Sequence, residues 1–261
     1  MSLPQPPQAP FVLGASVIGA SHAALGLPCQ DACAFEILAG RYCLAVVCDG
    51  LGSAARSDLG AGTAAQAALA AVKAHLTEVT GSEVMTGMTE IVTEAVAAAR
   101  TALEDLAARE QCPLRDLACT ILVLVATAGE IATAHIGDGA MVALTGGGLE
   151  IASAPGESEY VNEVVPLTSP GWREALRTGA RSADVRGVAL FSDGCQRVAL
   201  RKTATGYEPH DGFLDPVFAY AAELADLAAG TAEIDHLLAS PKLAAVSEDD
   251  KTLVIGILAP L

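Results

Sequence analysis

The chain has 261 residues, 52% of them hydrophobic, which is enough to bury a sizeable core. Its formal net charge is -16, so we expect no electrostatic attraction to nucleic acid or to an anionic membrane surface. No apolar stretch reaches the ~20 residues that span a bilayer, and residues 1–10 lack the parts of a signal peptide. A cytoplasmic protein is therefore expected.

The predicted elements are hairpin-like strands and long paired helices. Prolines in residues 1–10 predict a flexible lead-in, and residues 11–261 are expected to form a single domain. Strands are expected at residues 11–19, 32–38, 42–48, 118–126, 130–136, 140–144, 187–192 and 252–258. Helices are expected at residues 59–76, 83–109, 213–229 and 232–239. Because strands and helices do not alternate strictly, this order favours an α+β layered architecture.

Residues 145–186 have the weakest pattern in the chain. They are rich in Gly, Pro, Ser and charge, with one short helical candidate around residues 171–177. This composition predicts a surface excursion or flap. Further on, Asp211 followed by Gly212 is interpreted as a plain turn.

Several aspartates stand at the ends of predicted strands. Asp49 in LAVVCDG, Asp138 in TAHIGDG and Asp193 in VALFSDG each precede a glycine, and Asp250 precedes the last strand. One Asp-Gly pair is usually a turn. Several such pairs at the ends of central strands can converge on one rim of a sheet, where the clustered negative charges require cations. Oxygen ligands without histidine suit Mg²⁺ or Mn²⁺.

Two such ions would suit phosphoryl chemistry. They can share a water, lower its pKa and present it as hydroxide for in-line attack on phosphorus. They also neutralise charge on the phosphoryl oxygens. No nucleophilic side chain is then required.

Several motifs follow one another in a fixed order: CQDA at residues 29–32, VCDGLGS at 47–53, TILVL at 120–124, AHIGDG at 134–139, FSDG at 191–194 and DDKT at 249–252. This ordered set resembles the motifs of the metal-dependent type 2C serine/threonine protein phosphatase family, in its compact bacterial branch. Recognisable similarity extends from about residue 14 to residue 258. The resemblance implies a four-layer αββα sandwich, with two antiparallel β-sheets packed face to face, helices on both outer sides and metals in a cleft at the sandwich edge.

The resemblance also implies a binuclear site for Mg²⁺ or Mn²⁺. Asp49 would bridge both ions, and the carbonyl of Gly50 would bind one of them. Asp193 and Asp250 would hold the other. Asp49, Asp193 and Asp250 would thus act catalytically through the activated water.

Two further acidic positions are implied in supporting roles. Asp138 would help hold a third, weaker ion, and Asp31 would bind the ions through water or stand behind their direct ligands. Gln30 occupies a position where the family usually has Glu. A Glu carboxylate at this position could bind a metal through water. Gln lacks that charge, so weaker binding of one ion is expected.

Recognition of the substrate phosphate is less clearly specified. Many relatives place an arginine shortly before the first acidic motif, but residues 21–29 contain none. His22 and Arg56 are the candidate substitutes, and a solvated surface role is the alternative for each. Lys251, next to the last aspartates, is expected to pair with Asp249, and the alternative is that its charge lowers metal occupancy by repulsion.

The leading hypothesis is a phosphomonoester hydrolase that acts on phosphoserine or phosphothreonine of a partner protein. The alternative is a catalytically weak pseudophosphatase that binds a phosphoprotein or regulates a cognate kinase, prompted by Gln30 and the missing arginine. A third hypothesis is a metal phosphatase for a small phosphorylated molecule. The sequence specifies neither the physiological substrate nor the oligomeric state.

Overall fold

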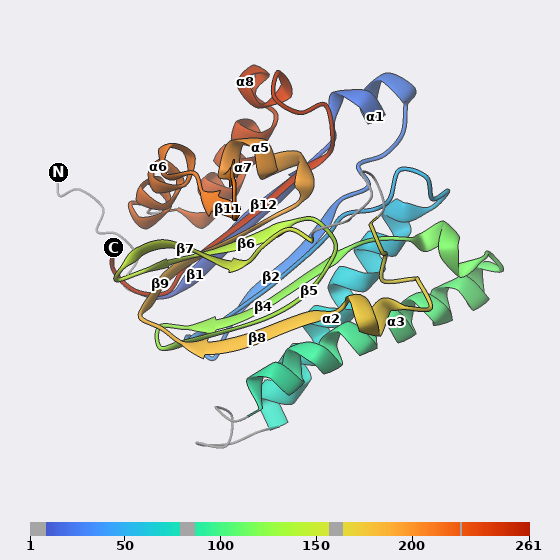
Figure 1. Ribbon diagram of the computed structural model, residues 1–261, viewed down its shortest axis with the longest axis horizontal. Helices are drawn as coiled ribbons and strands as arrows, with labels where there is room; N and C mark the ends of the chain where they lie inside the picture. The colour runs from blue at the N-terminus through green and yellow to red at the C-terminus, as the bar shows by residue number, and fades with distance from the viewer. Residues whose placement is uncertain (1–8, 79–86, 157–163, 225) are drawn as a thin grey trace.

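The computed structural model describes residues 9–78, 87–156, 164–224 and 226–261 (Figure 1). The strands are β1 Phe11–Val17, β2 Ala32–Leu38, β3 Tyr42–Cys48, β4 Ile121–Thr127, β5 Glu130–Ile136, β6 Ala140–Thr145, β7 Gly148–Ser153, β8 Arg177–Ser182, β9 Val185–Phe191, β10 Leu200–Thr203, β11 Gly206–Pro209 and β12 Lys251–Ile257. The α-helices are α1 Ala20–Leu25, α2 Ser57–Glu78, α3 Met88–Glu110, α4 Trp172–Ala175, α5 Gln196–Ala199, α6 Asp211–Ala222, α7 Leu227–Leu238 and α8 Pro241–Ala244. Short 3-10 turns lie at η2 Leu114–Leu117 and η3 Asp193–Cys195.

Two five-stranded antiparallel sheets form the centre of the molecule. One has the strand order β1-β12-β9-β6-β7 and the other the order β2-β3-β4-β5-β8. Figure 1 shows the sheets stacked face to face, with α2 and α3 along one outer side and α6 and α7 on the other. This arrangement confirms the expected αββα sandwich.

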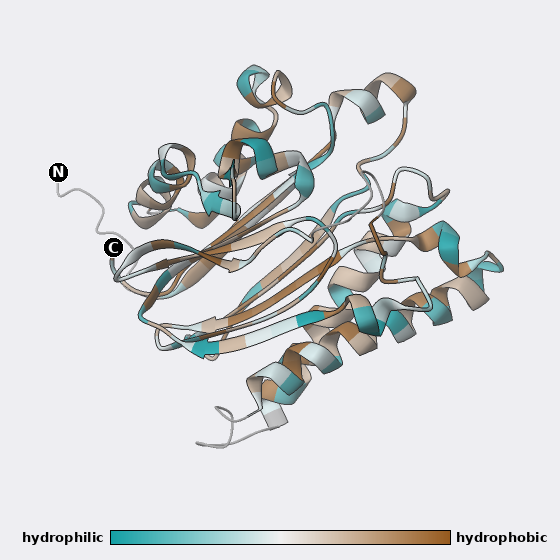
Figure 2. Cartoon of the chain, in the orientation of Figure 1, coloured by the Kyte–Doolittle hydropathy of each residue, from teal (hydrophilic) through white to brown (hydrophobic). Residues whose placement is uncertain are grey.

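Three apolar layers account for the stack. The layer between the sheets includes Val47, Leu122 and Leu190, and the two outer layers lie between each sheet and its helices. Central strands such as β3 and β12 are therefore buried on both faces, which explains why β3 is continuously apolar and why β12 is apolar after Thr252. In Figure 2 the strands of the two sheets carry long brown stretches, whereas the helices mix brown and teal along their length.

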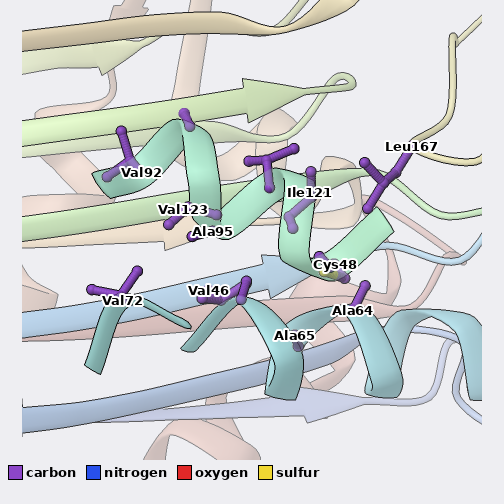
Figure 3. Packing of buried hydrophobic residues seen from close by; sticks show 14 of the residues in the cluster. Val46, Cys48, Ala64, Ala65, Val72, Val92, Ala95, Ile121, Val123 and Leu167 are labelled. Atoms are coloured by element: carbon purple, nitrogen blue, oxygen red, sulfur yellow. The ribbon is translucent and has the colours of Figure 1, made fainter. Parts of the chain in front are cut away.

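Alanine lets the long helices lie close to their sheet. Ala64 and Ala65 of α2 and Ala95 of α3 are fully buried, and they face Val46 and other side chains of β3 and β4 (Figure 3). Such small side chains keep the interior closely packed with few aromatic residues. None of the described helices has both the length and the apolar character needed to cross a bilayer.

The structure departs from the predicted elements in several places. Within residues 145–186 it contains β7 and β8; β8 is an edge strand with every residue exposed, so it carries no apolar alternation. The helix predicted at residues 213–229 is broken, because Asp226 caps a new helix by accepting hydrogen bonds from the amides of Ala228 and Ala229. Asp211 starts α6 and is not a plain turn.

Part of the sequence-based prediction lies outside the described residues. This applies to residues 1–8 of the lead-in, to the start of the helix expected at residues 83–109 and to residues 157–163 of the expected flap. The single-domain boundary and the flap remain predictions.

Candidate metal-binding active site

The antiparallel pairing brings the strand-end aspartates to one edge of the sandwich. β3 and β5 both pair with β4 and therefore run in the same direction, so Asp49 and Asp138 leave the same edge of their sheet. In the other sheet, β9 ends at Phe191 beside the beginning of β12, which places Asp193 near Asp249. The topology thus gathers residues that are far apart in the sequence.

A cleft of about 450 Å³ opens at this edge. Its acidic lining consists of Asp49, Asp138, Asp193 and Asp249. The rest of the lining is formed by Ser21, His22, Gly50, Leu51, Gly52, Thr120 and Val164. A larger hollow of about 680 Å³ lies between α6 and the C-terminal residues, but its lining is mostly Ala, Pro, Leu and Ile, so the chemistry points to the acidic cleft.

Asp49 is fixed by backbone contacts at the end of β3. Its amide donates to Thr120 Oγ1 at 3.0 Å, and its carbonyl accepts from the amide of Thr120 at 2.8 Å. The next amide, of Gly50, donates to the carbonyl of Gln30 at 3.1 Å. A Cβ on Gly50 would meet that same carbonyl at 2.7 Å, so only glycine fits between Asp49 and the loop that follows.

The first acidic motif lies behind the cleft. Asp31 is 8% exposed, and its Oδ2 accepts hydrogen bonds from Ser192 Oγ at 2.7 Å and from Thr252 Oγ1 at 2.8 Å. Gln30 is 7% exposed, and its Oε1 has no hydrogen-bond partner among the described residues. This oxygen and His22 Nε2 each lie 3.9 Å from the position that a Cβ would take on Gly52, in the cleft wall.

The last two aspartates face different ways. Asp249 lines the cleft, and its Oδ1 accepts from the amide of Asp250 at 2.9 Å. Asp250 is 3% exposed; its Oδ1 accepts from the amide of Gly19 at 2.6 Å, and its Oδ2 accepts from the amide of Gln30 at 2.6 Å. A third donor, His22 Nδ1, lies 2.9 Å from Oδ2. These contacts occupy both carboxylate oxygens of Asp250. The residue was expected to be a direct metal ligand, but it does not line the cleft.

The two candidate phosphate-binding residues are also separated by the structure. His22 lines the cleft. Arg56 does not; its Nη1 pairs with Glu110 Oε2 at 3.0 Å on the surface, where both side chains are about two-fifths exposed. Lys251 donates from Nζ to the carbonyl of Asp249 at 2.7 Å and not to its carboxylate.

The clustered carboxylates disfavour one another's ionisation. Burial raises the pKa of Asp49 well above its usual range, and the charges of Asp31, Asp193 and Asp138 raise it further. Burial raises the pKa of Asp193 to about 6, with repulsion from Asp138 and Asp249 adding to it. Burial raises the pKa of Asp31 to about 7, although the hydroxyls of Ser192 and Thr252 oppose the rise. A bound cation would favour the ionised carboxylates and so oppose these rises in pKa.

The donor set fits a hard divalent cation. The four lining carboxylates supply only oxygen, and none of them forms an ion pair with Lys, Arg or His of the described residues. In the part of the chain that the structure describes, no three His, Cys, Asp or Glu side chains are gathered tightly enough to enclose an ion by themselves. Mg²⁺ is compatible with this spacing, because it usually keeps several waters and takes only one or two carboxylates directly.

Sequence reasoning missed Asp249 and Thr120 as site residues. The signal for Asp249 is present in the DDKT motif, where two consecutive carboxylates must point in different directions. The sequence does not say which of them faces the cleft. Thr120 lies within the strand expected at residues 118–126, but its contact with Asp49 depends on how β3 and β4 pair, which the local sequence does not specify.

The chain resembles known protein phosphatases. A family described as Protein phosphatase 2C matches residues 18–239. The chain is similar to serine/threonine-protein phosphatase 3 of Escherichia coli strain K12, with 33% identity over 258 residues, covering 94% of this chain and 97% of the relative.

Solved structures share the fold. The catalytic domain of the serine/threonine phosphatase PstP, crystallised with two manganese ions, has a TM-score of 0.61 and 19% identity, covering 96% of this chain and 99% of that one. RsbX, crystallised with magnesium, has a TM-score of 0.56 and 11% identity, with 98% of each chain covered. At these identities the likeness concerns the fold.

Proposed function

Because the chain belongs to the protein phosphatase 2C family, we propose that it is a metal-dependent phosphatase that removes phosphate from phosphoserine or phosphothreonine of partner proteins. The observation that carries this proposal is the convergence of Asp49, Asp138, Asp193 and Asp249 on one cleft without a cationic side chain paired to them among the described residues. Relatives of known structure bind Mn²⁺ or Mg²⁺.

We propose that Asp49 and the Gly50 carbonyl, Asp193 and Asp249 hold two ions, and that Asp138 contributes to a third. Asp249 takes the place given to Asp250 in the sequence analysis, because Asp249 is the one that lines the cleft. When bound, Mg²⁺ or Mn²⁺ would supply an activated water as nucleophile and neutralise phosphoryl charge. Thr120 keeps the Asp49 backbone in place.

The residues behind the cleft have supporting roles in this proposal. Asp31 is held by the hydroxyls of Ser192 and Thr252, which fix the direction of its free oxygen. Gln30 offers its buried Oε1 as an acceptor for an ordered water, so replacing Glu by Gln keeps an acceptor at that position even though the charge is lost.

For the substrate phosphate we propose His22 and no longer Arg56. The Nδ1 of His22 is held by Asp250, so the ring is oriented with Nε2 toward the cleft wall at Gly52. Arg56 is engaged with Glu110 outside the cleft. A hydrogen bond from Nε2 to an ionised phosphoryl oxygen would be charge-assisted.

Metal-dependent hydrolysis tests the proposal directly. We would measure turnover of p-nitrophenyl phosphate and of a phosphothreonine peptide with Mn²⁺ and Mg²⁺, for the wild type, Asp49→Ala and Asp193→Ala. Asp105→Ala, on the exposed face of α3, is the matched control. We expect turnover that needs metal, is abolished in both cleft variants and is unchanged in the control. A wild type with no turnover on either substrate would overturn the proposal in favour of a phosphoprotein-binding pseudophosphatase.

A further inference from the structure

Arg177, the first residue of β8, holds three neutral acceptors beside the cleft. Its Nη1 donates to the carbonyl of Ala154 at 2.8 Å. Its Nη2 lies 3.0 Å from His135 Nδ1 and 3.2 Å from the carbonyl of Gly137. Burial lowers the pKa of the guanidinium, but Arg has no other protonation state at neutral pH, so this cation is committed to fixing backbone and imidazole acceptors.

His135 completes this arrangement from β5. It is fully buried, and it pairs with Arg177 across the β5–β8 ladder. A guanidinium can only donate, so Nδ1 accepts and the imidazole is neutral; burial, followed by the charge of Arg177, lowers the pKa of His135 accordingly. Its Nε2 then carries the hydrogen and has no partner among the described residues. An unpaired buried donor is costly, and the contacts of Nδ1 with Arg177 and with Ser153 Oγ at 2.8 Å keep the ring in place nonetheless.

The Gly137 carbonyl that Arg177 holds belongs to the turn that carries Asp138. It also accepts from the amide of Gly156 at 3.0 Å. Gly137 has φ of +119°, and a Cβ there would lie 2.6 Å from Thr120 Cβ, so this turn has little freedom to relax. On the other side of the turn, Gln196 Nε2 donates to the carbonyl of Asp138.

We infer that Arg177 is a positioning residue for Asp138: by holding the Gly137 carbonyl, it fixes the direction in which the Asp138 carboxylate enters the cleft. Arg177 does not line the cleft and touches no proposed ligand directly. Its effect therefore reaches the metals only through the turn. The inference rests on the proposed function, since it assigns Asp138 a share in metal binding.

Mn²⁺ binding in a double-mutant cycle tests this coupling. We would titrate the full chain with Mn²⁺ by calorimetry for the wild type, Arg177→Ala, Asp138→Ala and the double variant. Arg177→Ala should weaken the same binding phase as Asp138→Ala, by about 10-fold, the usual effect of losing a residue that orients a ligand. The double variant should bind no more weakly than Asp138→Ala alone, because Arg177 acts only through Asp138.

Two variants on β8 provide controls. Arg177→Lys keeps one donor and should recover part of the lost affinity. Arg181→Ala, on the same strand, removes only a surface pair with Glu150 Oε2 and should bind Mn²⁺ as the wild type does. Thermal unfolding of each metal-free variant separates lost affinity from lost folding.

The results that would overturn the inference are distinct from failure of the proposed site. Wild-type binding by Arg177→Ala would overturn it, as would additive losses in the double variant. The inference would also be overturned if Arg177→Ala weakened every Mn²⁺-binding phase in proportion to a lower melting temperature and Arg177→Lys recovered none of the lost affinity. If Asp49→Ala also left Mn²⁺ binding unchanged, the proposed metal site itself would be wrong.

Discussion

Asp250 Oδ2 accepts a hydrogen bond from His22 Nδ1 at 2.9 Å, so the second aspartate of the DDKT motif fixes a histidine and leaves the cleft to the first. The carboxylate reaches three separate segments: the Gly19 amide before α1, the Gln30 amide in the first acidic motif and the imidazole itself. Such a buried carboxylate is stabilised by its donors. Asp250 is thus an anchor for the cleft wall.

Substitutions of the two neighbours should separate metal binding from stability. Asp249→Asn should raise the Mn²⁺ concentration for half-maximal activity by about 10-fold or more, with little change in metal-free stability. Asp250→Asn replaces one accepting oxygen by an NH₂ group, which cannot accept from the buried donors around it. This substitution should lower the free energy of unfolding by about 1–3 kcal/mol. Mn²⁺ titrations and urea unfolding in EDTA measure both effects. The reverse pattern would restore Asp250 as the direct ligand.

His22 and Arg56 should differ in their effect on the substrate. His22→Ala should lower kcat/KM for a phosphothreonine peptide by roughly 10- to 100-fold, as expected for one hydrogen bond to a charged group. Arg56→Ala should stay within about 2-fold, since an exposed ion pair contributes about 1 kcal/mol or less. Steady-state kinetics at saturating Mn²⁺ measures both. Equal loss in the two variants, or loss in Arg56→Ala alone, would contradict the assignment.

The raised pKa of Asp31 makes a prediction about stability and pH. Its pKa is about 7 in the folded protein and 3.8 ordinarily, so between these values the folded state binds more protons than the unfolded state. The contribution of Asp31 to the free energy of unfolding is therefore fully favourable below about pH 4 and is lost as pH rises through 7. His135, whose pKa burial lowers, acts in the opposite direction below its unfolded pKa. A comparison with Asp31→Asn isolates the aspartate.

The measurement is thermal unfolding in EDTA from pH 5 to pH 8. Asn keeps an oxygen for the hydroxyls of Ser192 and Thr252 but cannot ionise. The melting temperature of Asp31→Asn should rise relative to the wild type as pH increases, and Mn²⁺ should reduce the difference by stabilising the ionised carboxylate. A difference that does not change with pH would show that Asp31 is not titrating in this range.

The sequence predicts the strands and the acidic edge well, for a physical reason. Strands such as β3 and β9 are apolar runs that end in Asp-Gly, and the pattern reports burial on both faces together with a turn. β8 could not be predicted this way. Its residues are all exposed at the edge of a sheet, so pairing with β5 is the reason that it is a strand, and this pairing is not encoded in a local pattern.

The candidate site residues that do not line the cleft are oriented by a different kind of contact. Asp49, Asp138 and Asp193 are directed by the strands that precede them, and the structure brings all three to the cleft. The orientation of Asp249 and Asp250 is set instead by amides of residues more than two hundred positions earlier in the chain. Arg56 lies near the cleft in sequence, but Glu110 of α3 draws its side chain away. Long-range contacts decide such cases.

Two glycines of α2 should respond oppositely to substitution by alanine. A Cβ on Gly60 would lie 2.1 Å from the carbonyl of Leu117, where α2 packs on the η2 turn, so Gly60→Ala should destabilise the fold by about 1–3 kcal/mol. A Cβ on Gly62 meets nothing within 4 Å, so Gly62→Ala should stabilise the helix by roughly 0.5–1 kcal/mol. Urea unfolding measures both differences. Since helix propensity favours alanine equally at the two positions, a stabilised Gly60→Ala would mean that α2 does not approach Leu117 as closely as this packing requires.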